Sequence, residues 1–207
     1  MRTFLPFLLS ILLVSCTAVT SAAPQVVAIY ATPSAQPWLE ELYACALDAS
    51  VALNMTAESP QIQLSLGEPE GWTGSVFQVG TEEIVIAANL QNPLGSLTLP
   101  QANEIFSGKG NPSRQVWAYA AGEDIQKAFD RAVMNGRGVT SFARLAVNPL
   151  QMSGALTADV NAIGFLPRHW MTGEMKELFI ATSLPVLALT PSEPEGIIRE
   201  LIACMQD

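Results

Sequence analysis

Short apolar runs alternate along the chain with segments whose apolar residues recur at helical spacing. The first run, residues 26–30, is apolar and β-branched, and it predicts a buried strand. A turn that contains Pro33 follows, and apolar positions at helical spacing across residues 38–47 then predict an amphipathic helix. The strand-then-helix order continues along the chain and favours an α/β fold with a mostly parallel or mixed sheet.

The same patterns predict the remaining elements. Strands are expected at residues 62–66, 76–79, 84–88, 116–119, 163–167, 178–181 and 186–189. Helices are expected after Thr98, at residues 122–134 and at residues 192–206, and residues 153–160 can form another. Residues 143–147 fit neither pattern. Ligands of such sheets usually sit beyond the carboxyl ends of strands, near helix N-termini.

The Ser-Gly-Lys triplet at residues 107–109 has the letters of a phosphate-binding loop, but its context does not fit one. That motif needs a glycine five residues before the Gly-Lys pair, where this chain has Asn103. A helix precedes the triplet, because Thr98 and Gln101 have the spacing of a capping box and Ser-Gly suits a helix end. The triplet therefore predicts the end of a helix, with Lys109 as a surface charge.

Residues 1–15 have the pattern of a secretory signal. Arg2 gives a positive start, and residues 4–14 form an apolar run too short to remain as a membrane span. The run ends in Leu-Val-Ser-Cys, which resembles the lipobox of bacterial lipoproteins and would make Cys16 the lipidated first residue of the mature chain. The alternative is an ordinary cleavage at the small residues 21–23. We expect a membrane-anchored lipoprotein of the bacterial cell envelope.

The mature chain is expected to be acidic. The sequence is 49% hydrophobic and 14% charged, which suits a chain with a real core. It has 10 basic and 19 acidic residues, so removal of Arg2 with the leader leaves 9 against 19, a net charge of −10. No basic block occurs, so nucleic acid is not an expected partner. Membrane contact would come from the lipid, with residues 16–24 as a tether of small residues.

Two cysteines remain if Cys16 is lipidated. Cys45 and Cys204 both lie in stretches that are predicted to be helical, near the two ends of the mature chain. An even pair in an exported protein suggests a disulfide between the first and last helices. Two buried free thiols are the alternative.

The sequence gives little support for a catalytic or metal-binding site. His169 is the only histidine, and beside a tryptophan it is more often a packed residue than a general base. No Gly-x-Ser-x-Gly elbow occurs. The neighbours Glu82 and Glu83, like the pair Glu193 and Glu195, lack the pattern of a metal-binding loop. We therefore expect no enzymatic activity, no metal and no cofactor.

Two blocks of residues carry a family pattern. They are Leu97-Thr98-x-x-Gln101-x-x-x-Ile105-Phe106-Ser107-Gly108-Lys109 and, at residues 159–166, Asp-Val-Asn-Ala-Ile-Gly-Phe-Leu. Together they resemble the phosphate-type solute-binding proteins of ABC transporters, which have the type 2 periplasmic-binding fold. The resemblance spans residues 25–207. It implies a compact first lobe of residues 25–88 with 185–207, a second lobe of residues 89–184, and a small solute bound between them.

The resemblance also implies candidate ligand-binding residues. Thr32 and Ser34 follow the first strand and open the first helix, where amide N–H groups point outward. Glu68 lies near the place where the family has an acidic ligand contact. Gly122 and Asp124 open the helix that contacts the ligand in the family. Helix capping is the alternative role for Thr32 and Asp124.

The chain departs from the family at that ligand-contacting helix. The family usually has an arginine and a Ser-Gly-Thr turn there, whereas residues 119–124 read Tyr-Ala-Ala-Gly-Glu-Asp. Two unit charges about 4 Å apart repel by about 4 kcal/mol at an effective dielectric constant near 20. The Gly-Ser-Gly turn of the first lobe is also missing, and residues 57–60 are acidic instead. These departures disfavour bound phosphate.

The resemblance implies a lipid-anchored, monomeric solute-binding protein of an ABC-type uptake system. Its expected partners are a small polar or anionic solute and an ABC permease or another membrane protein. The alternative is a sensory or scaffolding lipoprotein that keeps the fold but has no transport role. A hydrolase would rest on His169 alone.

Overall fold

A computed structural model describes residues 25–109, 111 and 113–206. The predicted leader, Cys16 and the tether lie outside these residues. The strands are β1 (Val26–Ala31), β2 (Ala52–Met55), β3 (Ile62–Leu66), β4 (Ser75–Asn89), β5 (Gln115–Ala118), β6 (Arg144–Leu145), β7 (Ala162–Pro167) and β8 (Met175–Thr190). The helices are α1 (Leu39–Asp48), α2 (Leu99–Phe106), α3 (Asp124–Ala132), α4 (Pro149–Ala158) and α5 (Gly196–Gln206), with 3-10 turns η1 (Gln36–Trp38) and η2 (Arg168–Trp170). None of the helices within the described ranges is long and apolar enough to cross a bilayer.

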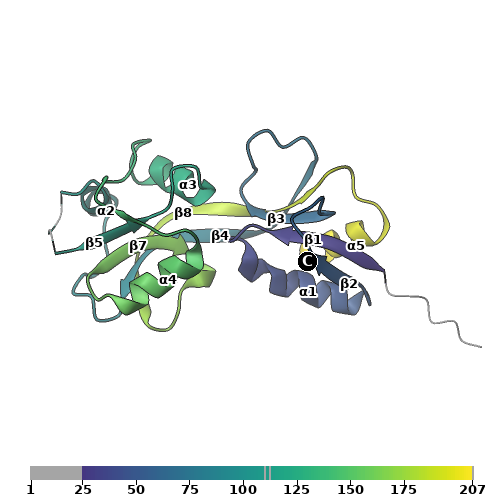
Figure 1. Cartoon of the computed structure of the whole chain (residues 1–207), viewed down its shortest axis with the longest axis horizontal. Helices are drawn as coiled ribbons and strands as arrows, with labels where there is room; N and C mark the ends of the chain where they lie inside the picture. Colours follow the sequence, from purple (N-terminus) through teal and green to yellow (C-terminus); the bar gives the residue numbers. More distant parts are fainter. Residues whose placement is uncertain (1–24, 110, 112, 207) are drawn as a thin grey trace, which may run out of the picture.

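One mixed sheet of eight strands runs through the described part of the chain in the order β2-β1-β3-β8-β4-β7-β5-β6. At one end β1 is parallel to β2 and β3, and at the other end β5 is parallel to β6 and β7. The antiparallel pair β4 and β8 joins the two ends (Figure 1). We call the group β1, β2, β3, α1 and α5 lobe 1, and the group α2, α3, α4, β5, β6 and β7 lobe 2. The predicted α/β class with a mixed sheet and two lobes is confirmed.

The two joining strands are longer than the sequence predicted. Separate strands at 76–79 and 84–88 were expected, but β4 is continuous across residues 80–83, and it stays paired with β8 through register shifts at Gln78/Gly80, Ile84/Val85 and Ile86/Ala87. The expected strands at 178–181 and 186–189 are likewise one strand. Both predictions are wrong because polar residues interrupt the apolar pattern where the strands cross between the lobes, while the pairing continues. The edge strands β2 and β6 were not predicted.

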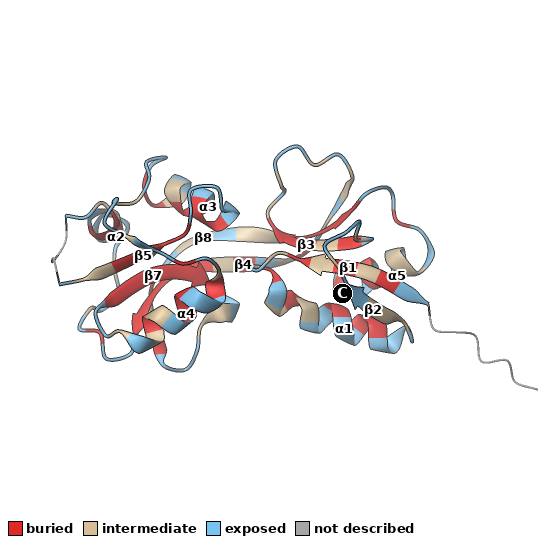
Figure 2. Cartoon of the chain, viewed as in Figure 1, coloured by how far each residue is buried: buried red, intermediate tan, exposed pale blue. Residues whose placement is uncertain are grey.

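An aromatic cluster fixes the helices of lobe 2 against its strands. The rings of Phe129 on α3 and Phe165 on β7 are stacked with centroids 3.8 Å apart, and Phe106 on α2 meets Phe129 edge-on at 4.7 Å. Buried residues follow the strands of both lobes (Figure 2). The predicted capping box begins α2, because the Thr98 N–H donates to Gln101 Oε1 at 2.8 Å. The aromatic cluster therefore fixes the position of α3 relative to β7 in lobe 2.

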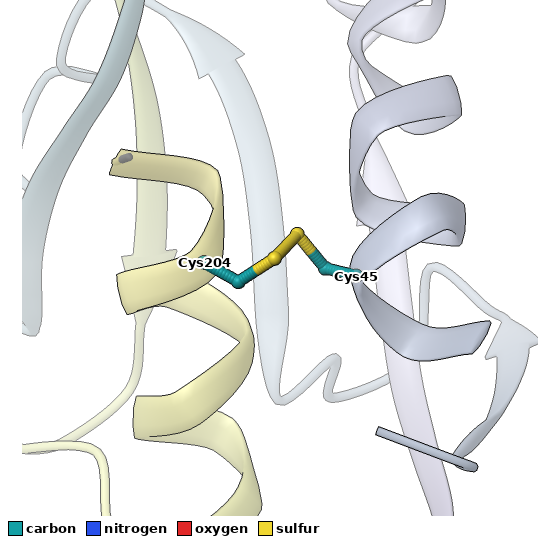
Figure 3. Close-up of a disulfide and its surroundings, with 2 residues drawn as sticks. All are labelled: Cys45 and Cys204. Carbon is teal, nitrogen blue, oxygen red and sulfur yellow. A yellow bond between two sulfur atoms is a disulfide. The ribbon is translucent and has the colours of Figure 1, made fainter. Parts of the chain in front are cut away.

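A disulfide closes lobe 1. Cys45 on α1 and Cys204 on α5 are bridged, with their Cα atoms 5.9 Å apart (Figure 3). The predicted pairing is confirmed, and the alternative of two free thiols is excluded. The bridge joins residues 159 positions apart in the sequence, so it encloses lobe 2 and both joining strands.

Candidate functional site

The turn after β1 presents two hydroxyl groups from lobe 1. The Thr32 N–H donates to the Leu64 carbonyl at 3.0 Å, and the Thr32 carbonyl accepts from the Ala35 N–H at 2.9 Å. These bonds tie the turn to β3 and to the start of η1. The side chains of Thr32 and Ser34 are half-buried. Within the described part of the chain neither hydroxyl has a protein hydrogen-bond partner, so both are free to bind a ligand.

The N-terminus of α3 presents the opposite wall from lobe 2. The buried Gln126 side chain accepts from the Tyr119 N–H at 2.9 Å, which anchors the loop after β5 to the helix. Asp124 is exposed at the first turn and lies 3.6 Å from Lys127 Nζ. The N-cap residue Glu123 makes no side-chain capping bond. The two carboxylates are therefore not consumed by capping the helix.

These two walls enclose the first of two adjoining hollows, which we call the hydroxyl hollow. Its volume is about 320 Å³. Its lining residues are Tyr30, Thr32, Pro33, Ser34, Leu66, Glu123, Asp124 and Val147. Among the residues that the structure describes, the lining contains two carboxylates and no lysine or arginine. This hollow is suited to hydrogen-bond donors rather than to a multiply charged anion.

The second hollow, which we call the charged hollow, adjoins the first along Leu66 and Asp124. Its volume is about 280 Å³, and its charged lining residues are Glu68, Glu70, Asp124, Lys127 and Arg131. Glu68 and Glu70 come from the loop after β3 in lobe 1, whereas Lys127 and Arg131 come from α3 in lobe 2. The charged hollow therefore offers both signs of charge. We call the two hollows together the interlobe cleft.

Burial shapes the titration of two groups behind the cleft. The hydroxyl of Tyr119 is buried, and burial, together with the charge of Glu123, raises its pKa above the ordinary range. Burial also raises the pKa of Asp130, and the hydrogen bond from Gln126 Nε2 to Asp130 Oδ1, 2.8 Å long, acts in the opposite direction. Tyr119 therefore stays neutral at physiological pH and supplies no charge to the cleft.

The cleft brings together most of the residues singled out from the sequence. Thr32 and Ser34 line the hydroxyl hollow, Glu68 lines the charged hollow, and Asp124 lines both. Gly122 is not among the lining residues, and a Cβ atom there would meet only open space.

Sequence reasoning did not single out Lys127, Arg131 or Val147 as cleft residues. Lys127 and Arg131 follow Asp124 at helical spacing, so they lie on the same face of α3. That spacing is a signal that could have found them. Val147 reaches the hydroxyl hollow from the loop before α4, and no sequence pattern marks it.

Two further hollows lie within single lobes. One, of about 370 Å³, is lined in lobe 2 by residues that include Arg114, Thr140 and Phe142. The other, of about 630 Å³, lies beside the start of α5 in lobe 1 and includes Ser192 and Glu193. Neither has walls from both lobes. The interlobe cleft is therefore the stronger candidate for a site that couples binding to movement of the lobes.

No protein-family model matches the chain, and no curated protein matches it by sequence. Solved structures do match. A protein of Clostridium perfringens described as a phosphate ABC transporter substrate-binding protein, with phosphate bound, has a TM-score of 0.74 and 17% identity over 87% of this chain and 92% of its own. An ABC-type phosphate transport receptor from Vibrio cholerae has a TM-score of 0.61 and 15% identity, covering 87% and 93%. The regulatory domain of CcmR from Synechocystis PCC6803, in complex with 2-PG, has a TM-score of 0.67 and 10% identity, covering 88% and 96%.

Proposed function

We propose that this chain is a lipid-anchored solute-binding protein of the bacterial cell envelope. The premise is its type 2 periplasmic-binding fold, which the two motif blocks predicted. In this proposal Cys16 carries the lipid and the protein acts as a monomer. It delivers a small polar or anionic solute to an ABC-type permease. The proposed domain bounds divide the joining strands as well: residues 25–88 with 185–207 belong to the domain of lobe 1, and residues 89–184 to that of lobe 2. No covalent chemistry takes place in the cleft.

The observation that carries the proposal is the convergence of polar side chains from both lobes on one cleft. Lobe 1 contributes the hydroxyls of Thr32 and Ser34, which have no protein partner among the described residues, and lobe 2 contributes the exposed start of α3. Of the strands in the described ranges, β4 and β8 are the two that join the lobes, so a small change of twist in this ribbon moves one wall relative to the other. A solute that contacts both walls would favour the closed arrangement.

The charges of the cleft narrow the choice of solute. Glu123 and Asp124 face the hydroxyl hollow without a lysine or arginine in its lining, which disfavours inorganic phosphate at that position. An anionic group fits better beside Lys127 and Arg131 in the charged hollow. The solute that suits both hollows is small, rich in hydroxyl or amino groups, and carries at most one negative charge.

A thermal-shift screen tests the proposal. The purified protein is heated with a panel of sugars, amino acids, polyamines, carboxylates and inorganic phosphate. A solute present at about 100 times its dissociation constant stabilises the protein by about 2.7 kcal/mol. For a chain of this size such a gain raises the midpoint by about 5–11 °C. We expect this shift for one chemical class and none for inorganic phosphate.

Matched variants connect any shift to the cleft. Thr32→Ala removes a hydroxyl from the hydroxyl hollow, and Asp124→Asn removes the carboxylate shared by both hollows. Each should reduce the affinity at least tenfold. Thr73→Ala, in an exposed loop, is the control and should leave the affinity unchanged. An identical affinity in Thr32→Ala, Asp124→Asn and wild type would place the solute elsewhere.

A second function keeps the fold without transport. The carboxylates of Glu123 and Asp124, together with the likeness to the CcmR regulatory domain, favour a sensory or scaffolding lipoprotein that contacts another protein. The screen separates the two functions, because silence across the whole panel supports the scaffold. His169 lines neither hollow of the cleft, so the cleft gives no support to a hydrolase.

A further inference from the structure

A buried carboxylate lies in the ribbon that joins the lobes. Glu82 is in β4, opposite Leu184 of β8, where both strands cross between lobe 1 and lobe 2. Its side chain is 0% exposed. An ionised carboxylate out of contact with water is costly unless it is paired and hydrogen-bonded. The partners of Glu82 therefore decide how firmly this part of the ribbon is held.

Those partners come from both lobes. From the lobe 1 side, Trp38 at the end of η1 donates its Nε1–H to Glu82 Oε2 at 2.8 Å. From the lobe 2 side, the backbone N–H of His169 in η2 donates to Glu82 Oε1 at 3.3 Å, and His169 Nδ1 lies 2.6 Å from Glu82 Oε2. The rings of Trp38 and His169 also meet edge-on, with centroids 5.2 Å apart. One carboxylate thus ties the first helix of lobe 1 to the segment that follows β7.

Among the groups around this cluster, His169 is the one that can supply a positive charge to Glu82. Arg168, next to it, is occupied by Glu83 at 2.6 Å and by Glu177 of β8 at 2.5 Å. The other elements beside η2, namely η1, α4 and β7, carry no charged side chain. His169 is therefore the remaining source of a positive charge for Glu82, and its side chain is 52% exposed.

We propose that the Glu82–Trp38–His169 cluster is a proton-sensitive tie that sets the resting arrangement of the two lobes. The inference deepens the proposed function, because it concerns regulation of the same cleft, and it rests on that function only for its biological use. In the neutral imidazole, Nδ1–H donates to the Glu82 carboxylate and Nε2 faces water. A proton taken from water at Nε2 gives an imidazolium ion paired with a buried carboxylate, and no bond other than N–H is made.

The direction of the effect follows from burial. Protonation of His169 adds a positive charge to a ring that already donates to the buried, ionised Glu82 carboxylate and so turns the hydrogen bond into an ion pair, which strengthens the tie. Because the tie exists in the arrangement described here, acid conditions should hold the lobes in that arrangement. Loss of the proton removes the positive charge beside Glu82 and should free the ribbon to sample other arrangements. Solute affinity would then depend on pH without any titrating group in contact with the solute.

The first test measures the separation of the lobes directly and needs no solute. Spin labels are placed at the exposed positions Asp48→Cys on α1 and Glu104→Cys on α2, and the distance distribution is recorded at about pH 5 and about pH 8. In the wild-type background we expect one narrow distance at the lower pH and at least a twofold broader distribution at the higher pH. In His169→Gln and in Glu82→Gln the two distributions should coincide.

Glu83→Gln is the matched control, because it changes the neighbouring carboxylate of the same strand, which binds Arg168 instead of His169. It should retain the pH response. A wild-type distribution that does not change with pH overturns the proposal, and so does a response of equal size in His169→Gln. A failed solute screen would leave this result standing, so the failures of the two proposals are distinguishable.

A second measurement needs no substitution. Since His169 is the only histidine, a uniformly 15N-labelled sample gives a single pair of imidazole nitrogen resonances. The tie requires the neutral ring to carry its proton on Nδ1, whereas the neutral ring of free histidine prefers Nε2. A neutral ring protonated on Nε2 would contradict the geometry of the tie, whatever the labelled variants show.

Discussion

The disulfide between Cys45 and Cys204 should stabilise the protein mainly through its unfolded state. Its removal in Cys45→Ala/Cys204→Ala leaves the contact between α1 and α5 but frees the two chain ends after unfolding. The bridge joins residues 159 positions apart. In the chain-entropy model, a loop of this length contributes about 5 kcal/mol at 25 °C. For a chain of about 200 residues, that loss lowers the unfolding midpoint by about 10–20 °C.

Circular dichroism during heating gives the measurement, with wild type, the double variant and the two single variants at one pH. Reduction of wild-type protein should reproduce the midpoint of the double variant, because both lack the same constraint. Each single variant should match the double variant, since one remaining thiol cannot form the bridge. A drop of less than about 3 °C in all variants would show that the loop-closure reasoning fails here.

Two further substitutions test features of the fold. Gly80→Ala places a Cβ atom against the indole of Trp38, so it should lower the free energy of unfolding in urea by about 1–3 kcal/mol. In the control Gly122→Ala the new Cβ atom meets open space, so the free energy of unfolding should change by less than about 0.5 kcal/mol. Burial raises the pKa of Asp130 in the folded state, so ionisation of this carboxyl destabilises the folded protein at neutral pH. Below about pH 3.9 the carboxyl is protonated in both the folded and the unfolded state, so this destabilisation disappears. Asp130→Asn should therefore raise the unfolding midpoint at about pH 7 and lose that gain at about pH 3, since an asparagine can still accept from Gln126. A gain that is equal at both pH values would refute the assignment to ionisation.

The sequence predicted the fold where local signals and tertiary packing agree. The capping pattern of Thr98 and Gln101 marked the start of α2, and the apolar run at residues 163–167 marked β7, whose residues are all buried. The signals failed in the joining strands. Polar residues interrupt the apolar alternation there, although β4 and β8 stay paired. The two-residue strand β6 is too short to produce any pattern.

The cleft was predictable only in part, because the sequence marks residues by their place between a strand and a helix but not by how the two lobes face each other. Thr32, Ser34 and Asp124 stand where a strand gives way to a helix, and this position alone marks them as candidates. Val147 could not be found in this way, because its place in the hydroxyl hollow depends on how lobe 2 faces lobe 1 across the joining strands. The role of Glu82 was hidden as well. Its partners Trp38 and His169 are 44 and 87 positions away in the sequence. In addition, two adjacent glutamates are typical of an exposed, charged surface.

The order of the strands also determines when each half of the molecule can be completed during synthesis. Lobe 2 is built from one continuous stretch between β4 and β8, so its helices and strands are all available before the chain ends. Lobe 1 must wait, because β3 is flanked on one side by β1 and on the other by the last part of β8, where Gln63 pairs with Leu189. Its bridge also needs Cys204, near the C-terminus. A chain that is cut short by a few tens of residues would therefore carry a finished lobe 2 beside an open-edged lobe 1, a form prone to aggregation and to proteolysis.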